Sequence, residues 1–445
     1  MTKTAHDAEA IHYKDFTKQQ KVTMLSTTAG FSLEHMDHSL IPIATTAIVA
    51  SLGVTQAAAG LITTFAMTGT LLGGLFFGML ADKIGRARIF NWTIFVVAFA
   101  TAALYFADNI YEIYFLKFIA GFGTAAEYGA GVTLIAESFA GKKIGRLTSL
   151  AHIGGQTGTI LAAIASAVIL PKYGWNALCL FGLLPIAFAF FVRRNLKDSA
   201  EFEEARRKRD LEKKQQQLPI IEVFKTPALA YQTTALVLMM MVQIGGYYGI
   251  LTWLPKTMQA HLGLPVGKST LWTVAMVIGM SLGMYFFGSF LDKFGPRKAF
   301  GLFLSFSALA LYLPTFANNA LSLLIIMLIV GFFSNGMYAG FGVIVSRLYP
   351  AEARVTANSV VSSGGKFLGG FFPAIVGVLM DKFSFTYVLL FFTLSYLFSL
   401  IIMLPFQLCA GKTFNSKFKK SSCGVTFLVR AIFLPFRFLK KGRVL

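Results

Sequence analysis

The feature that most constrains this chain is a series of long apolar runs between Val22 and Phe406. Each run holds roughly 18 to 28 residues, and ~20 residues are enough for a helix to cross the ~30 Å hydrocarbon core of a bilayer. A hydrophobic share of 56% is also too high for a soluble globular chain of 445 residues. The predicted fold class is therefore an all-α polytopic membrane protein with twelve transmembrane helices. The predicted spans are residues 22–50, 57–80, 89–107, 111–138, 147–170, 173–192, 227–254, 269–291, 298–317, 320–348, 355–380 and 384–406.

The net charge of +20 is distributed unevenly along the chain. Basic residues gather in the loops that follow the second, fourth and sixth spans, and the loops between these are nearly neutral. Because basic loops are retained in the cytoplasm, we expect both termini on the cytoplasmic side of the cell inner membrane. Anionic headgroups are a sufficient partner for this charge, so we expect membrane lipid and no nucleic acid as its partner.

An internal repeat divides the chain into two halves at an offset of about 210 residues. The matched positions are Gly78, Asp82, Gly85 and Arg86 with Gly288, Asp292, Gly295 and Arg297, Gly121 and Tyr128 with Gly331 and Tyr338, Arg146 with Arg354, and Gln156 with Lys366. Six helices are therefore duplicated. The predicted organisation is a cytoplasmic N-terminal segment at 1–21, an N-terminal six-helix half at 22–192, a cytoplasmic linker at 193–226, a C-terminal six-helix half at 227–406 and a basic and apolar cytoplasmic tail at 407–445.

The segments outside the spans carry no sign of another domain. Residues 1–21 lack the basic start, short apolar core and cleavage site of a secretory signal. The apolar core of the tail at 407–445 is too short to cross a bilayer, so we expect an interfacial segment held by anionic lipid, with a frame-altered tail as the alternative. Cys179, Cys409 and Cys423 show no paired spacing, which predicts neither a disulfide framework nor a metal site.

The loop pattern Gly78-x-x-x-Asp82-x-x-Gly85-Arg86-x-Arg88 resembles the loop motif of the major facilitator superfamily, and its second copy begins at Gly288. The resemblance covers residues 22–406 and implies two six-helix pseudo-repeats that rock about a central site, which is alternating access. Two shorter stretches, 33–37 and 126–130, resemble the metabolite:proton symporters, which include sialic acid, shikimate and related carboxylate carriers.

The resemblance also implies that the loop motifs act as gates at the membrane surface. Arg86 would meet Glu137 at the end of span four, and Asp82 would face the start of span eleven, which would lock the outward-open state. The alternative is that the basic residues of this loop only set topology. The implied gating residues are Gly78, Asp82, Gly85, Arg86, Arg88, Glu137, Arg146, Gly288, Asp292, Arg297 and Arg354.

Charged side chains near the middle of a span are expensive in hydrocarbon and are functional candidates by default. Glu34 and Asp37 lie about halfway along span one, where they share a helical face with His38, while His35 points a quarter-turn away. A carboxylate of this kind can take up a proton on one side and release it on the other. The alternatives are a structural ion pair for the two acids and a packing role for the two histidines.

Span four adds two candidates for proton coupling, Lys117 and Glu127. Lys117 is either the cationic partner of span one or a lysine whose side chain extends to the outer surface. Glu127 is too deep for that and either lines the cavity or makes a buried structural hydrogen bond.

Lys366 lies near the middle of span eleven, at the position that Gln156 occupies in the first half. One cation near the midplane suggests an anionic substrate, whereas the structural alternative is an ion pair with Glu127 or Asp37. Polar groups in otherwise apolar helices complete the predicted substrate site. Its residues are Lys366, Gln156, Gln243, Tyr247, Asn335 and Tyr338, and ordinary packing is the alternative for each tyrosine.

These residues predict a secondary transporter that takes up a small organic anion with protons, acting as a monomer with the proton gradient as driving force. No cofactor or metal is expected, and the chain is not expected to be an enzyme, because no nucleophile elbow, phosphate loop or metal-ligand spacing occurs in it. One alternative is a proton-driven efflux antiporter. An efflux pump for lipophilic cations would be expected to have the buried acids but no lysine such as Lys366. The other alternative is a membrane sensor that binds a solute without moving it.

Overall fold

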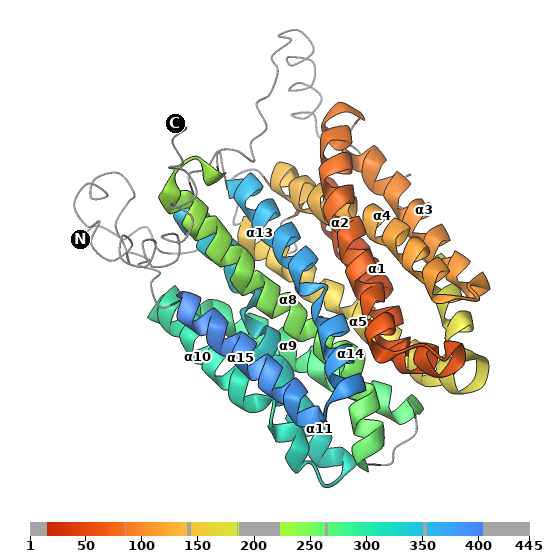
Figure 1. Ribbon diagram of the computed structural model, residues 1–445. Coiled ribbons are helices and arrows are strands. Elements are labelled where there is room, and N and C mark those ends of the chain that lie inside the picture. The colour runs from red at the N-terminus through yellow and green to blue at the C-terminus, as the bar shows by residue number, and fades with distance from the viewer. Residues whose placement is uncertain are drawn as a thin grey trace, which may run out of the picture.

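The computed structural model of the protein describes residues 16–84, 86–139, 144–184, 186, 223–262, 266–349 and 354–403. These residues form a bundle of helices, with the earlier helices on one side and the later ones on the other (Figure 1). The first half contains α1 (Lys18–Leu52), α2 (Gln56–Ile84), α3 (Arg86–Ala103), η2 (Leu104–Phe106), α4 (Ile110–Ser138), α5 (Ile144–Cys179) and η3 (Leu180–Leu183). The second half contains α8 (Pro227–Leu262), α9 (Val266–Phe294), α10 (Pro296–Ala310), η5 (Leu313–Phe316), α11 (Ala320–Gly336), η6 (Met337–Ala339), α12 (Gly340–Leu348), α13 (Arg354–Gly369), α14 (Phe372–Lys382) and α15 (Phe385–Met403).

The helices follow the apolar runs of the sequence, so the all-α prediction is confirmed. Within the described residues, eight segments are long and apolar enough to cross a membrane. The long helix α1 is not among them, because the charged and polar side chains around Glu34 and Asp37 lower its hydropathy. Span six, predicted at 173–192, lies partly outside the described residues. It begins after a sharp turn at Gly174, whose φ of 77° belongs to the left-handed region that glycine tolerates.

The internal repeat is visible in how the helices pack. A Cβ atom added to Gly69 of α2 would lie 2.1 Å from the carbonyl oxygen of Phe118 in α4. The same addition to Gly279 of α9 would lie 2.0 Å from the carbonyl oxygen of Leu328 in α11. Both glycines therefore allow backbones to touch, as small residues do between membrane helices. The α2–α4 contact and the α9–α11 contact are the same contact in the two halves.

Two spans of the second half are interrupted in the middle. In span ten the short 3₁₀ segment η6 separates α11 from α12, and Tyr338 lies in it. In span eleven α13 ends at Gly369, and α14 begins after two intervening residues, with Pro373 in its first turn. Such breaks are tolerated at membrane depth where the chain is buried in protein or lines a cavity. They place the ends of short helices near the centre of the bundle.

The two halves meet closely along the first part of α2, which packs against α14 and the residues just before it. The Thr64 hydroxyl donates a hydrogen bond to the Gly370 carbonyl oxygen at 2.8 Å. A Cβ atom on Gly60 would lie 2.4 Å from the Pro373 carbonyl oxygen, so the two backbones are in direct contact. The helix pairs α1–α8 and α5–α9 also join the halves. The bundle is therefore closed at the end where α1 finishes and α2 starts.

Candidate functional site

Helix α1 carries the polar centre of the bundle. It packs against α5 and α4 of its own half and against α8 of the other half, so side chains around its circumference reach different helices. Glu34, Asp37 and His38 are buried, and His35 is partly buried. Although Glu34, Asp37 and His38 were predicted to share one face of the helix, each of them contacts a different neighbour. The candidate residues of α1 thus lie where α4, α5 and α8 all pack against this helix.

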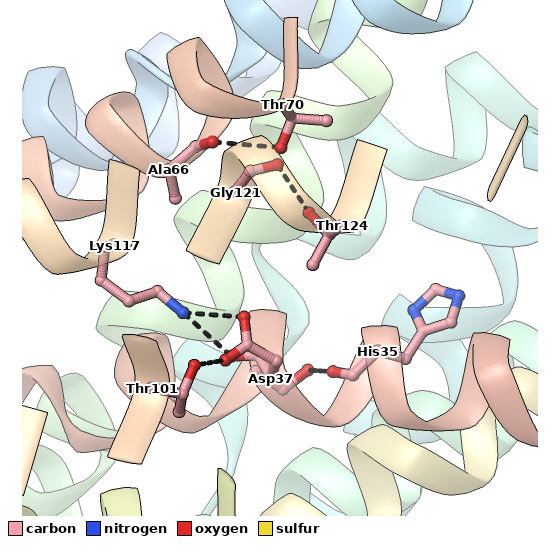
Figure 2. A network of polar contacts seen from close by, with 9 residues as sticks. His35, Asp37, Ala66, Thr70, Thr101, Lys117, Gly121 and Thr124 are labelled. Atoms are coloured by element: carbon pink, nitrogen blue, oxygen red, sulfur yellow. Dashed lines mark hydrogen bonds and ion pairs between the residues drawn. The ribbon is translucent and has the colours of Figure 1, made fainter. Parts of the chain in front are cut away.

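Asp37 is held within the N-terminal half by two partners (Figure 2). Its Oδ2 atom lies 2.9 Å from Lys117 Nζ, and both side chains are almost fully buried. Lys117 also donates to the backbone carbonyl oxygen of Asp37 at 3.4 Å. The Oδ1 atom accepts a short hydrogen bond from the Thr101 hydroxyl of α3. Of the two interpretations for Lys117, the structure therefore shows the cationic partner of span one rather than a side chain that extends to the surface.

Glu34 faces the other half of the molecule. Its Oε1 atom lies 3.5 Å from Nζ of Lys366 in α13, and the exposed fractions of the two side chains are 5% and 14%. Its buried Oε2 atom has no hydrogen-bond partner among the described residues. Lys366 lies in the last turn of α13, where the carbonyl end of a helix favours a cation. Lys366 thus pairs with Glu34, a contact that was not predicted from the sequence, and the predicted pairing with Glu127 involves a side chain outside the described residues.

The opposite side of α1 meets α5. His35 Nε2 lies 3.5 Å from Nε2 of Gln156, whose own Oε1 atom is buried without a partner among the described residues. Gln156 and Lys366 are equivalent in the internal repeat, so the N-terminal half has a neutral amide beside His35 where the C-terminal half has a cation beside Glu34. This arrangement makes the centre of the bundle asymmetric in charge.

Two features of this region were not predicted from the sequence. His152 of α5 stacks on Phe31 with ring centroids 4.6 Å apart, and it contacts Tyr338 of the other half edge-on at 6.2 Å. His152 could have been predicted by the same criterion as Gln156, because both are polar residues in an apolar span. Thr101 gave no signal that distinguishes it from the other threonines of the spans.

The remaining predicted substrate residues, Gln243, Tyr247, Asn335 and Tyr338, lie in the C-terminal half. Gln243 Nε2 of α8 donates to the Ser334 carbonyl oxygen at 2.6 Å and to the Asn335 side chain. The Gln243 Oε1 atom is buried without a partner among the described residues. Tyr247 is buried beside Tyr248, with ring centroids 5.0 Å apart, and its hydroxyl has no hydrogen-bond partner among the described residues. These residues close the C-terminal side of the same central region.

Several predicted residues lie where the structure gives no side-chain detail. Glu127 is in α4, but its side chain is outside the described set. The same holds for most of the gating motif. Gly85 and the side chains of Asp82, Arg86, Arg88, Glu137, Arg146, Asp292 and Arg354 are outside it. Gly288 and Arg297 are described, and Arg297 is exposed. The gating role thus remains a prediction.

The chemistry available in this centre is ionic. Within the described residues, no group of three or more His, Cys, Asp or Glu side chains could hold a metal ion. The site instead offers two buried acids, each paired with a lysine, and one of the two pairs crosses between the halves. A buried charge that loses its partner is costly, so each charge needs a new partner when its ion pair breaks. A mobile anion and a proton are the species that can exchange with them.

The comparison with known proteins agrees with this architecture. Residues 27–279 and 236–445 match the family described as the Major Facilitator Superfamily. A "Putative metabolite transport protein" of Haemophilus influenzae is 31% identical over 373 residues, which cover 81% of this chain and 89% of that protein. The sialic acid transporter NanX of Escherichia coli is 28% identical and covers 91% and 98%. The 4-hydroxybenzoate transporter PcaK of Pseudomonas aeruginosa is 24% identical and covers 81% and 86%.

Solved structures show the same fold. The crystal structure of a D-xylose-proton symporter superimposes with a TM-score of 0.71 at 16% identity and covers 88% of this chain and 99% of that one. A partially occluded inward-open conformation of the xylose transporter XylE from Escherichia coli gives a TM-score of 0.68 at 18% identity, with 89% and 100% covered. The predicted fold of twelve transmembrane helices in two six-helix pseudo-repeats is therefore confirmed.

Proposed function

Because this chain belongs to the major facilitator superfamily, we propose that it is a secondary active transporter that takes up a small organic anion together with protons. Membership of the family makes it a multi-pass membrane transporter rather than an enzyme. The proposed substrate class is a carboxylate metabolite. The carrier works as a monomer in the inner membrane with both termini in the cytoplasm, since one chain supplies both halves of the site.

The observation that carries this proposal is the position of Lys366. It is a cation between the two halves, near the middle of a membrane span, and its partner is a carboxylate of the opposite half. Ionisable residues at this depth usually mark a substrate or proton pathway because their burial is expensive. A lysine there attracts a carboxylate as a compact charge, and a buried acid beside it can carry a proton.

The relatives support the same substrate class. The transporters named for sialic acid and for 4-hydroxybenzoate both handle molecules that carry a carboxylate at neutral pH. Their identity to this chain is 28% and 24%, so the shape of the substrate is left to the side chains around the pairs. Gln156, Gln243 and Asn335 are proposed to make those contacts, since amide groups can both donate and accept hydrogen bonds.

The experiment that tests the proposal is uptake by proteoliposomes under an inward proton gradient, with a proton-sensitive dye inside. The panel contains sialate, 4-hydroxybenzoate, shikimate and short carboxylates, together with the neutral amide of each acid where it exists. We expect acidification of the lumen with one anion and none with its amide. Acidification that is absent for every anion, or acidification of the lumen while a loaded solute leaves the vesicles, would reject uptake symport and favour the efflux antiporter.

A further inference from the structure

The two glutamines of the predicted substrate site each have a buried side-chain oxygen that lacks a donor. Gln156 of α5 and Gln243 of α8 are 3% and 1% exposed. Neither Oε1 atom has a hydrogen-bond partner among the described residues. A buried acceptor without a donor is costly, because burial removes its hydration without replacement. Both amides therefore require a hydrogen-bonding group that the described part of the chain does not supply.

The orientation of the Gln243 amide is fixed by its neighbours. Its Nε2 atom donates to the Ser334 carbonyl oxygen at 2.6 Å and to the side-chain oxygen of Asn335. Ser334 lies in the last turn of α11, where carbonyl oxygens lack partners within the helix. A half-turn of the amide would set its own oxygen against these two oxygens. The unpartnered atom of Gln243 is therefore an acceptor, and only a donor can satisfy it.

The internal repeat shows which residue of the first half corresponds to Gln243. The contacts between α1 and α5 recur between α8 and α13, as the neighbours of their glycines show. The matched contacts are Gly154–Thr28 with Gly364–Val237, Gly155–Phe31 with Gly365–Met240, and Gly158–Ser32 with Gly369–Met241. In every match the α8 residue follows its α1 counterpart at the same interval along the chain. At this interval Gln243 is the counterpart of Glu34.

This correspondence gives the centre of the bundle two chemically different sides. Glu34 pairs with Lys366 across the two halves. Since Gln243 corresponds to Glu34 and Gln156 corresponds to Lys366, the repeat relates this ion pair to the two glutamines. The repeat therefore sets two neutral amides where the symmetry-related side has two opposite charges. A ligand that fits both sides carries a charge at one end and neutral hydrogen-bonding groups at the other.

Tyr247 indicates which neutral group fits. It lies one turn after Gln243 on the same face of α8, and its buried hydroxyl has no partner among the residues that the structure describes. A hydroxyl group of a ligand can donate to an amide oxygen and accept from a phenol. It also satisfies Gln156 in either orientation of that amide. An ammonium group can only donate, and the Ser334 and Asn335 contacts of Gln243 include no carboxylate to offset its charge.

Resting on the proposed function, we propose that the transported anion carries at least two hydroxyl groups besides its carboxylate, one for Gln156 and one for Gln243. The carboxylate lies at Lys366, and the hydroxylated end lies at the two amides. An acid without these hydroxyls leaves the amides buried and unpartnered. Sites built to bind a substrate hydroxyl strongly reject analogues that lack it. The carrier therefore selects polyhydroxylated acids over plain aromatic or aliphatic acids of the same shape.

The test measures the affinity of the purified protein for pairs of acids that differ only in their hydroxyl groups. The pairs are quinate with cyclohexanecarboxylate, shikimate with cyclohexenecarboxylate, and gluconate with hexanoate, and 4-hydroxybenzoate is added as an acid with one hydroxyl. We expect the tightest ligand to be a polyhydroxylated acid and its deoxygenated partner to bind at least about 10-fold more weakly. Equal affinities within that pair, or a tightest ligand with fewer than two hydroxyls, would overturn the inference.

A variant separates substrate contact from packing. Gln156→Met keeps the length of the side chain and removes the amide. We expect it to weaken binding of the polyhydroxylated acid by about 5-fold or more and to leave the deoxygenated acid unchanged. Gln56→Met is the control, because it also removes a buried, unpartnered amide oxygen but lies in the first turn of α2, and the ratio of the two affinities should stay as in the wild type. Equal weakening of both acids by Gln156→Met would show a packing role and overturn the inference.

If no acid of the panel binds, the unliganded protein still decides. Tyr247→Phe removes only a hydroxyl without a partner, so its melting temperature should equal or exceed that of the wild type. A marked fall would show that this hydroxyl is already bonded and would overturn the inference. Failure of the proposed function looks different. Equal affinity for a polyhydroxylated acid and its neutral amide would remove the anion and leave the requirement for hydroxyls standing.

Discussion

Asp381 of α14 and Ala57 of α2 belong to opposite halves, and the Asp381 Oδ2 atom accepts a hydrogen bond from the Ala57 backbone N–H at 2.9 Å. The Oδ1 atom accepts from the Gln56 N–H at 3.2 Å. These N–H groups belong to the first turn of α2, which has no partners for them within the helix. The carboxylate thus caps a helix of one half from the other. The bond exists only while this end of the bundle is closed.

Removal of this cap should favour opening at that end. Substitution of a capping side chain by alanine costs about 1 kcal/mol, so Asp381→Ala should shift the population of carriers towards the form open at the α2–α14 seam. The shift can be measured as a longer distance between spin labels at positions 54 and 382. Asp381→Asn is the matched control, since its amide oxygen still accepts one bond and should give a smaller shift. Identical distance distributions in all three proteins would contradict this function of the cap.

The buried pair of Asp37 and Lys117 predicts strong non-additivity in stability. Removal of one partner leaves an uncompensated buried charge, which costs roughly 3–5 kcal/mol. Asp37→Asn and Lys117→Met should each lower the melting temperature of the purified protein markedly. The double variant should recover most of the loss, because no charge is then left unpaired. If the two losses simply add in the double variant, the pair does not exist in the protein.

Lys366 predicts a loss of anion affinity that depends on charge. Truncation of one member of a buried charge pair costs about 2 kcal/mol or more, which corresponds to a loss of roughly 30-fold in affinity. Lys366→Ala should therefore bind the transported anion at least that much more weakly, and Lys366→Arg should retain part of the affinity. Lys298→Ala, which removes an exposed cation of α10, is the control. Unaltered binding by Lys366→Ala would remove this residue from the substrate site.

The repeated glycine contacts predict matched effects in the two halves. Gly69→Ala and Gly279→Ala each place a methyl group about 2 Å from a backbone oxygen of the neighbouring helix, so both should destabilise the protein by forcing helices apart. Gly342→Ala is the control, because a Cβ there lies within 4 Å of no atom of the described residues and alanine is the better helix former. Thermal unfolding in detergent measures all three. Equal melting temperatures for the three variants would show that the close contacts do not occur.

Much of this architecture could be predicted from the sequence, because membrane spans and duplicated motifs are local signals. Apolar runs located the helices, and the echo of Gly78–Arg86 at Gly288–Arg297 separated the halves. The depth of Glu34, Asp37 and Lys366 within their spans was enough to select them as candidates. These signals need only residue type and position along one helix.

The pairing of the charges could not be predicted, because it depends on how helices rotate and on which half each side chain faces. Glu34 and Asp37 are less than one helical turn apart, yet one contacts α13 and the other contacts α3 and α4. Lys366 could equally have met Asp37 on the basis of depth alone. Thr101 and Asp381 were not predicted for the same reason, since a threonine in a span or an acid at a helix end becomes informative only through its neighbour.

The central claim, that anion and proton move together, is tested most directly by reversing the gradient. Vesicles are loaded with the transported anion and diluted into anion-free buffer of the same pH, with the membrane potential clamped. Coupled transport predicts that the lumen becomes alkaline in step with substrate efflux, because each departing anion removes a proton. Substrate efflux at an unchanged internal pH would contradict coupling and leave the protein as a uniporter for organic anions.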